Sequence, residues 1–109
     1  MDKKRTDTVL TIEEALNLVR LYKQVIAPRF DVEPRVLMFG SYSKGYANPD
    51  SDIDVAVILP GSDITDRWEQ SADLWSDIRK VSVLIEPVLM EDNEDSMLYR
   101  EVMRTGVTV

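Results

Sequence analysis

Two apolar runs frame the stretch that most limits how this chain can fold. The run 36–39 leads directly into Gly40-Ser41, and the run 53–59 begins inside the triplet Asp52-Ile53-Asp54. Short apolar runs bounded by turn residues are typical of buried strands. We therefore predict two core strands with a polar, glycine-containing connection between them.

The second run carries charge where a buried strand should carry none. Side chains alternate between the two faces of a strand, so Asp52 and Asp54 point the same way, with their Cα atoms roughly 6.6 Å apart. Two carboxylates about 5 Å apart repel by roughly 3 kcal/mol at an effective dielectric constant of about 20. Such a pair needs a compensating charge, and Mg²⁺, which prefers oxygen ligands, supplies one. The pair therefore predicts a metal site.

A structural loop is the alternative interpretation of these aspartates. Segments that contain Asp, Pro and Gly form ordinary turns, and aspartates often cap elements without any catalytic role. A turn accounts for Asp50, which we interpret as a solvated loop carboxylate. It does not account for Asp54, whose side chain lies on the same strand face as Ala56 and Ile58. A charge on this apolar face requires a partner. We therefore favour the metal site.

The connection after the first strand has the composition of a phosphate-binding turn. Gly40 lacks a Cβ and lets the backbone approach a bulky ligand, while Ser41 is suited to cap a short helix over residues 42–44. The free N–H groups at a helix start and the helix dipole favour phosphate groups. Lys44 would add a cation, although a loop lysine is more often only a solvated charge. We expect a nucleoside triphosphate between this turn and the metal.

A third acidic residue, Glu86, interrupts the apolar stretch 81–89, over which we predict a third strand. A single carboxylate in the middle of a buried strand is strongly destabilising without a partner. Pro87 follows it and removes a hydrogen-bond donor, which indicates an edge strand or a strand end. One interpretation is therefore a glutamate at a strand edge that faces water or pairs with an arginine.

The spacing of the Gly-Ser pair from the Asp-x-Asp triplet resembles the signature of the minimal nucleotidyltransferases, a group within the DNA polymerase β-like nucleotidyltransferase superfamily. The matching residues are Gly40-Ser41-x-Ser43-Lys44-Gly45 and Pro49-x-Ser51-Asp52-Ile53-Asp54. The tail 99–107 is also similar to the end of these proteins, so the resemblance covers nearly the whole chain. It implies a fold like the polymerase β palm, with Glu86 as the third metal-binding carboxylate beside Asp52 and Asp54.

The resemblance also implies a reaction and a partner. An acceptor hydroxyl would attack the α-phosphate of ATP, with two Mg²⁺ ions held by the three carboxylates and the other phosphates held by Gly40, Ser41 and Lys44. Minimal nucleotidyltransferases act as antitoxins to HEPN-domain toxins, so the implied acceptor is such a toxin. Two alternatives stay open: an antitoxin that masks its partner without catalysis, and a small-molecule transferase of the aminoglycoside type, which the short chain disfavours.

Helical periodicity surrounds the predicted strands. Thr11 and Glu14 form a capping box at the start of a helix over 11–27, and a second helix over 63–79 would connect the second strand to the third. The pattern predicts an α/β domain over residues 11–109 with a small mixed sheet, preceded by a flexible arm over residues 1–10.

The remaining segments complete this single domain. A last helix would run from about Ser96 to Arg104 and end at Gly106, followed by a short strand over 107–109. Trp68 and Trp75 lie seven residues apart on the second helix. A base-stacking platform is one interpretation of this pair, but we expect the two side chains to pack in the core.

Composition excludes several classes of function. The chain has 109 residues, a net charge of -7, and neither Cys nor His. The acidity argues against direct binding to nucleic acid or to an anionic membrane, and the absence of His excludes serine triads with a histidine base. The absence of Cys fits a reducing compartment, and no apolar run approaches membrane length. We expect a cytoplasmic protein, with homo-oligomer formation left open.

Overall fold

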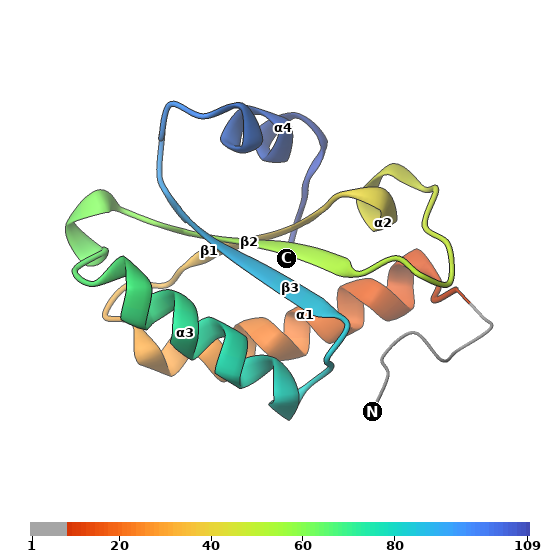
Figure 1. Ribbon diagram of the computed structural model, residues 1–109, viewed down its shortest axis with the longest axis horizontal. Coiled ribbons are helices and arrows are strands. Elements are labelled where there is room, and N and C mark those ends of the chain that lie inside the picture. Colours follow the sequence, from red (N-terminus) through yellow and green to blue (C-terminus); the bar gives the residue numbers. More distant parts are fainter. Residues whose placement is uncertain (1–8) are drawn as a thin grey trace.

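The computed structural model describes residues 9–109, which form a sheet with helices on both faces (Figure 1). The helices are α1 (Ile12–Ile26), α2 (Ser41–Lys44), α3 (Arg67–Asp77) and α4 (Met97–Thr105). The strands are β1 (Arg35–Phe39), β2 (Ile53–Leu59), β3 (Ile85–Glu91) and β4 (Val107–Thr108). Residues 1–8 lie outside the described part, and with them most of the arm predicted over residues 1–10. No helix within residues 9–109 is long and apolar enough to span a membrane.

The strand order in the sheet is β3-β2-β1-β4. β1 pairs antiparallel with both β2 and β4, whereas β2 and β3 run parallel. Parallel neighbours cannot be joined by a tight turn, and α3 provides the crossover between them. The predictions of a small mixed sheet, of a crossover helix and of a strand after Gly106 are confirmed. β3 lies at the edge, as Pro87 indicated.

Two predicted boundaries were wrong. β3 begins at Ile85 rather than at residue 81, because a 3₁₀ segment (Ile78–Lys80) and a turn follow α3. α3 itself begins at Arg67 rather than at residue 63, because Gly61–Asp63 forms another 3₁₀ segment. The carboxylate of Asp66 caps the helix by accepting a hydrogen bond from the backbone N–H of Glu69 at 3.1 Å.

α1 forms as predicted. The hydroxyl of Thr11 accepts from the backbone N–H of Glu14 at 3.0 Å, and the Glu14 carboxylate accepts from the backbone N–H of Thr11 at 2.8 Å. This capping box satisfies two donors that the helix start would otherwise leave open. One face of the helix packs against the sheet through Ala15, Leu16, Val19, Tyr22 and Ile26.

The two faces of the sheet carry different partners. Alternate strand residues, among them Met38, Val55 and Val57, pack against α1 and α3 in the larger apolar core. The intervening residues, which include Ala56 and Ile58, face the opposite side and form a smaller cluster with Tyr99 and Val102 of α4. In Figure 1, α1 and α3 lie on one side of the sheet and α4 with α2 on the other.

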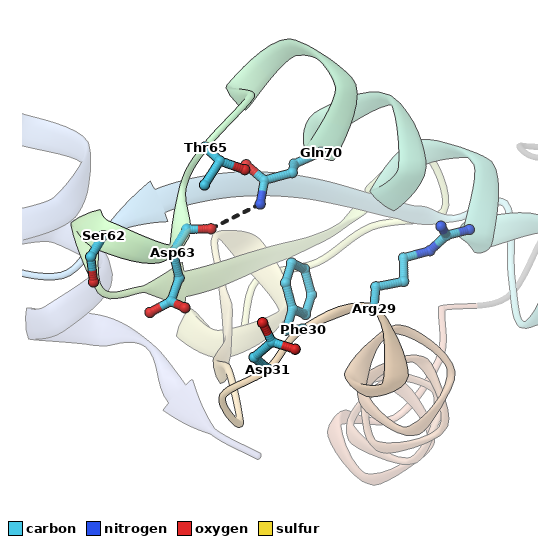
Figure 2. Close-up of a pocket in the computed structure, with 7 residues that line it drawn as sticks. All are labelled: Arg29, Phe30, Asp31, Ser62, Asp63, Thr65 and Gln70. Atoms are coloured by element: carbon cyan, nitrogen blue, oxygen red, sulfur yellow. Dashed lines mark hydrogen bonds between the residues drawn. The ribbon is translucent and has the colours of Figure 1, made fainter.

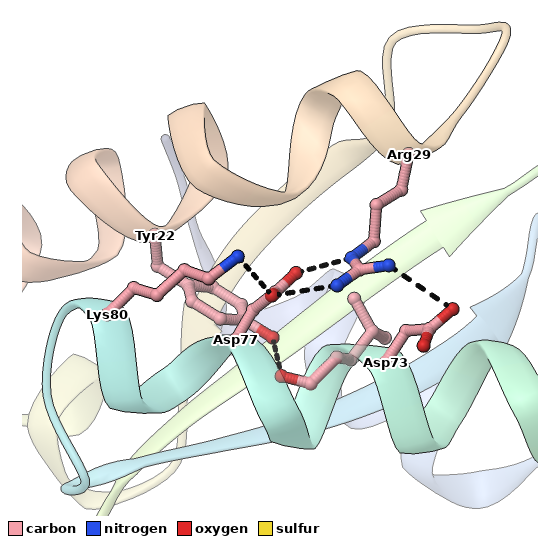
Figure 3. Close-up of polar contacts among 6 residues, drawn as sticks. Tyr22, Arg29, Asp73, Asp77 and Lys80 are labelled. Carbon is pink, nitrogen blue, oxygen red and sulfur yellow. Dashed lines mark hydrogen bonds and ion pairs between the residues drawn. The ribbon is translucent and has the colours of Figure 1, made fainter.

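A buried ion pair fixes α3 against the end of α1 (Figure 3). The buried carboxylate of Asp77 accepts two hydrogen bonds from the Arg29 guanidinium, at 2.6 and 3.0 Å, and lies 3.1 Å from Lys80 Nζ. The hydrogen bonds from Arg29 lower the pKa of Asp77. Nearby, the buried Tyr22 hydroxyl donates to the backbone oxygen of Leu74 at 2.7 Å. Desolvation raises the pKa of this hydroxyl.

The tryptophan prediction was wrong. Trp68 is 88% exposed and Trp75 is 46% exposed, so neither belongs to the core. α3 instead buries Leu74 and Asp77. Asp77 can face inward because Arg29 neutralises it, and this turns the helix so that the tryptophans lie outside.

Candidate active site

The turn after β1 requires glycine at position 40. Gly40 has φ of 76°, a conformation that L side chains rarely adopt, and it occupies the N-cap of α2. The prediction that Ser41 caps this helix was therefore wrong by one residue, since Ser41 is its first residue. The hydroxyl of Ser43 donates to the backbone oxygen of Gly40 at 2.9 Å, and the N–H of Lys44 donates to the same oxygen at 3.1 Å. These bonds hold the turn in its unusual shape.

The Asp54 carboxylate lies directly against this turn. A Cβ built on Gly40 would be 2.1 Å from Oδ2 of Asp54, a separation that no atom pair of this kind tolerates. Strand pairing explains the approach, because Phe39, the residue before Gly40, is opposite Asp54 in the β1–β2 register. Glycine at position 40 thus leaves the space that the Asp54 carboxylate fills.

Register also brings Glu86 beside Asp54. The two residues are paired in the parallel β2–β3 ladder, and neighbouring strands lie about 4.8 Å apart. Residues in register point to the same face, and both are half-buried on the face that α4 partly covers. Glu86 is therefore placed next to one of the two predicted aspartates, although it comes from a strand beyond the crossover helix.

Asp52 lies just before β2, two residues ahead of Asp54 in an extended segment. Its Oδ1 atom is buried. Within residues 9–109, no three acidic side chains are already gathered closely enough to form a metal site. The metal site predicted for Asp52, Asp54 and Glu86 therefore stays a prediction.

Lys44, the expected phosphate-binding cation, forms an ion pair with Glu101 of α4. Glu101 also pairs with Arg104, and its backbone oxygen accepts from the Thr105 hydroxyl at 2.9 Å. The hydrogen bond that Lys44 donates to the Glu101 carboxylate raises the pKa of Lys44, and the bonds that Glu101 accepts from Lys44 and Arg104 lower the pKa of Glu101. The sequence analysis did not find this pair. No local spacing signals a contact between residues so far apart in the chain.

A cavity of about 250 Å³ lies elsewhere (Figure 2). Its lining includes Asp31, Phe30 and Arg29 after α1, with Ser62, Asp63, Thr65 and Gln70 after β2. The first three precede β1, whose start pairs with the end of β2, and the other four follow β2. Asp52 and Asp54 lie at the opposite end of β2. The Gln70 amide donates to the backbone oxygen of Asp63 at 2.9 Å, which ties the lining together. The cavity is therefore separate from the candidate active site.

The arrangement combines oxygen ligands with a backbone turn. Asp54 and Glu86 supply carboxylates in register, and the residues of the Gly40 turn lie in direct contact with one of them. Oxygen-only ligand sets suit hard cations such as Mg²⁺, and backbone N–H groups suit phosphates. The site is thus suited to a metal-bound phosphate compound rather than to chemistry that needs a thiol or an imidazole.

Solved structures resemble this chain over most of its length. One is a protein from Sulfolobus solfataricus assigned as a nucleotidyltransferase, with a TM-score of 0.60 and 19% identity over 93% of this chain and 87% of that one. At this identity the likeness shows the fold. Two toxin–antitoxin structures are also similar. The first, solved with AMP-PNP, has 24% identity and a TM-score of 0.46, covering 91% of this chain and 72% of that one.

The second is a mutant form of the toxin–antitoxin MntA-HpeT, with 27% identity and a TM-score of 0.47, covering 93% of this chain and 72% of that one. Comparison with curated proteins gives no match. The family model described as polymerase beta, nucleotidyltransferase matches residues 23–109, which include the Gly40 turn and all three predicted carboxylates. The chain therefore belongs to the polymerase β nucleotidyltransferase family.

Proposed function

We propose that this protein is a metal-dependent nucleotidyltransferase that transfers AMP from ATP to a hydroxyl group of a partner protein. The observation that carries the proposal is the contact between Gly40 and Asp54, with Glu86 in register beside Asp54. This contact places the turn that we propose to bind phosphate against the proposed metal-binding carboxylates. Because the chain belongs to the nucleotidyltransferase family, transfer of a nucleotide is the reaction that we propose for this site.

Asp52, Asp54 and Glu86 would hold the divalent ions, with Mg²⁺ as the expected metal. When bound, the ions offset the charge of the triphosphate and stabilise the attacking and leaving oxygens. The half-buried position of Asp54 and Glu86 fits this role, because carboxylates there gain more from a cation than exposed ones would. The backbone N–H groups near Gly40 and Ser41 would orient the β- and γ-phosphates.

The transfer exchanges a phosphoanhydride bond of ATP for a phosphate ester bond to the acceptor. The acceptor oxygen forms a bond to the α-phosphorus as the bond from that phosphorus to the pyrophosphate oxygen breaks. The hydroxyl proton passes to water or to a carboxylate of the site, since the chain has no histidine to accept it. Lys44 would contribute only by leaving Glu101 for a phosphate oxygen.

The acceptor is proposed to be a HEPN-type toxin, with this chain as its antitoxin in the cytoplasm. Most of the described chain forms the sheet and the helices around it, which leaves little to bind a separate acceptor. On α4, Met97 is 83% exposed and Leu98 is 42% exposed, which gives an apolar surface next to the face that carries Asp54 and Glu86. A protein acceptor could dock there with its hydroxyl directed at the site.

A masking antitoxin is the second candidate. The Lys44–Glu101 ion pair favours it, because the expected phosphate-binding cation is engaged within the chain. The exposed residues of α4 would serve docking equally well without catalysis. Under this hypothesis the carboxylates would have no role in neutralising the toxin.

Intact-mass spectrometry of the toxin distinguishes the two candidates. The toxin is incubated with ATP, Mg²⁺ and either the wild type or Asp54→Asn. The transferase hypothesis predicts a gain of about 329 Da for each AMP with the wild type and none with the variant. Asp50→Asn, in the exposed loop, is the matched control and should behave as wild type. A toxin that is inhibited equally by Asp54→Asn, with no mass change, would support masking.

A further inference from the structure

One ion pair joins the turn at Gly40 to a helix on the same side of the sheet (Figure 1). Lys44, the last residue of α2, pairs with Glu101 of α4, and its backbone N–H donates to the Gly40 oxygen at 3.1 Å. Gly40 in turn lies against the Asp54 carboxylate. The backbone of Lys44 is therefore tied to the candidate active site, whereas its ammonium group is bound to α4.

Glu101 has a second cationic partner within its own helix. Its Oε2 atom pairs with Lys44 and its Oε1 atom with Arg104, which lies three residues later on α4. Removing one partner of an ion pair is most destabilising when the remaining charge is left without any partner. Arg104 would still neutralise Glu101 if Lys44 left, since residues three apart on a helix are neighbours. Lys44 can therefore be released without leaving Glu101 unpaired.

The pair between Lys44 and Glu101 is also open to competition. The two side chains are 30% and 27% exposed, and ion pairs that keep contact with water contribute little to stability. The triphosphate of ATP carries more negative charge than one carboxylate, and lysine is a common partner of phosphate oxygens. A nucleotide held at the Gly40 turn would therefore compete with Glu101 for the ammonium group of Lys44.

We propose that Lys44, Glu101 and Arg104 form an autoinhibitory switch, in which Glu101 competes with ATP for Lys44 and pairs with Arg104 alone once the nucleotide has bound. The inference rests on the proposed function, because the triphosphate must lie between the Gly40 turn and Asp54. Glu101 and Arg104 are positioning residues, since they act on the nucleotide only through Lys44. The switch makes the affinity for ATP depend on α4, the helix proposed to receive the partner protein.

Calorimetric titration of the full chain with ATP and Mg²⁺ tests the switch. Glu101→Gln should bind ATP about two- to tenfold more tightly than the wild type, because Lys44 is released. Arg104→Met should bind ATP more weakly than the wild type, because Glu101 then has Lys44 as its remaining cationic partner. Asp95→Asn removes an exposed carboxylate that pairs with Arg100. It is the matched control for the change in net charge and should bind ATP as the wild type does.

The same two substitutions in a Lys44→Met background separate the switch from a general effect of charge near the nucleotide. If Glu101 and Arg104 act through Lys44, both substitutions lose their effect on ATP affinity, whereas a through-space effect of charge would persist. Circular dichroism verifies that each variant is folded. Equal ATP affinity in the wild type and Glu101→Gln, or effects that persist in Lys44→Met, would overturn the switch alone. Absence of ATP binding in both the wild type and Glu101→Gln would overturn the proposed function as well.

Discussion

The two faces of the sheet differ in what the chain has placed on them. One face packs wholly apolar strand residues against α1 and α3, and it holds the larger core. The other face carries Asp54 and Glu86 next to a smaller apolar cluster under α4. The larger core can hold the fold together while the second face tolerates charge. If stability and chemistry are divided in this way between the two faces, substitutions on each face should have different effects, which the following predictions test.

Asp54→Asn should have the largest effect, a loss of activity without a loss of stability. Removing one of the carboxylates should lower nucleotide transfer about 1,000-fold or more. The same change relieves repulsion with Glu86 and Asp52, so the free energy of unfolding without metal should rise by about 1 to 3 kcal/mol. Transfer assays and urea denaturation in EDTA measure the two effects. A clearly less stable variant would mean that Asp54 has a structural role.

Two glycine substitutions compare the site with a turn outside it. Gly40→Ala places a Cβ against Asp54 at positive φ and should destabilise the protein by about 3 kcal/mol or more. Gly45→Ala is the control, because Gly45 also has positive φ but no atom lies within 4 Å of its Cβ position. It should cost about 1 kcal/mol. Equal losses in thermal unfolding would show that the contact with Asp54 is unimportant.

Asp77→Asn tests the opposite face, where the buried ion pair should matter for stability and not for transfer. The change should reduce the free energy of unfolding by about 2 to 3 kcal/mol, less than for a fully buried pair because Arg29 and Lys80 are partly exposed. Asp73→Asn, at a longer and more exposed contact with Arg29, should cost less than about 1 kcal/mol. Urea denaturation measures both values.

The same pair predicts a pH dependence. Because Arg29 lowers the pKa of Asp77 below its ordinary value of 3.8, the folded state favours the ionised carboxylate. Its contribution is complete above that value and is lost as the pH falls through the lowered pKa. The stability difference between wild type and Asp77→Asn should therefore be constant above about pH 4 and shrink below it. A difference that grew on acidification would contradict this assignment.

Glu101→Gln should have the smallest effect. It removes the ionic partner of Lys44, which then becomes available to phosphate oxygens. We expect KM for ATP to fall about two- to tenfold with kcat nearly unchanged. Lys44→Met should reverse this gain when combined with Glu101→Gln. An unchanged KM in Glu101→Gln would show that Lys44 does not reach the nucleotide.

Local signals were predicted well and long-range contacts were not. The Thr11 capping box and the alternation along the strands act over a few residues, so they could be recognised directly. The burial of Asp77 depends on Arg29, which lies in another element. Because Asp77 faces inward, Trp68 and Trp75 face outward, although the apolar pattern of the helix predicted that they would be buried. The candidate site residues were named from spacing and resemblance. The Gly40–Asp54 contact and the Lys44–Glu101 pair required the structure.

Metal-dependent nucleotide binding tests the central claim most directly. Calorimetric titration of the wild type with ATP in the presence of Mn²⁺ or Mg²⁺ should give binding that is lost without metal and lost in Asp52→Asn. Asp50→Asn should bind as the wild type does, and bound metal with nucleotide should raise Tm by mass action. Absence of binding at millimolar metal and nucleotide, or equal binding by Asp52→Asn, would contradict the assignment of these carboxylates as the metal site.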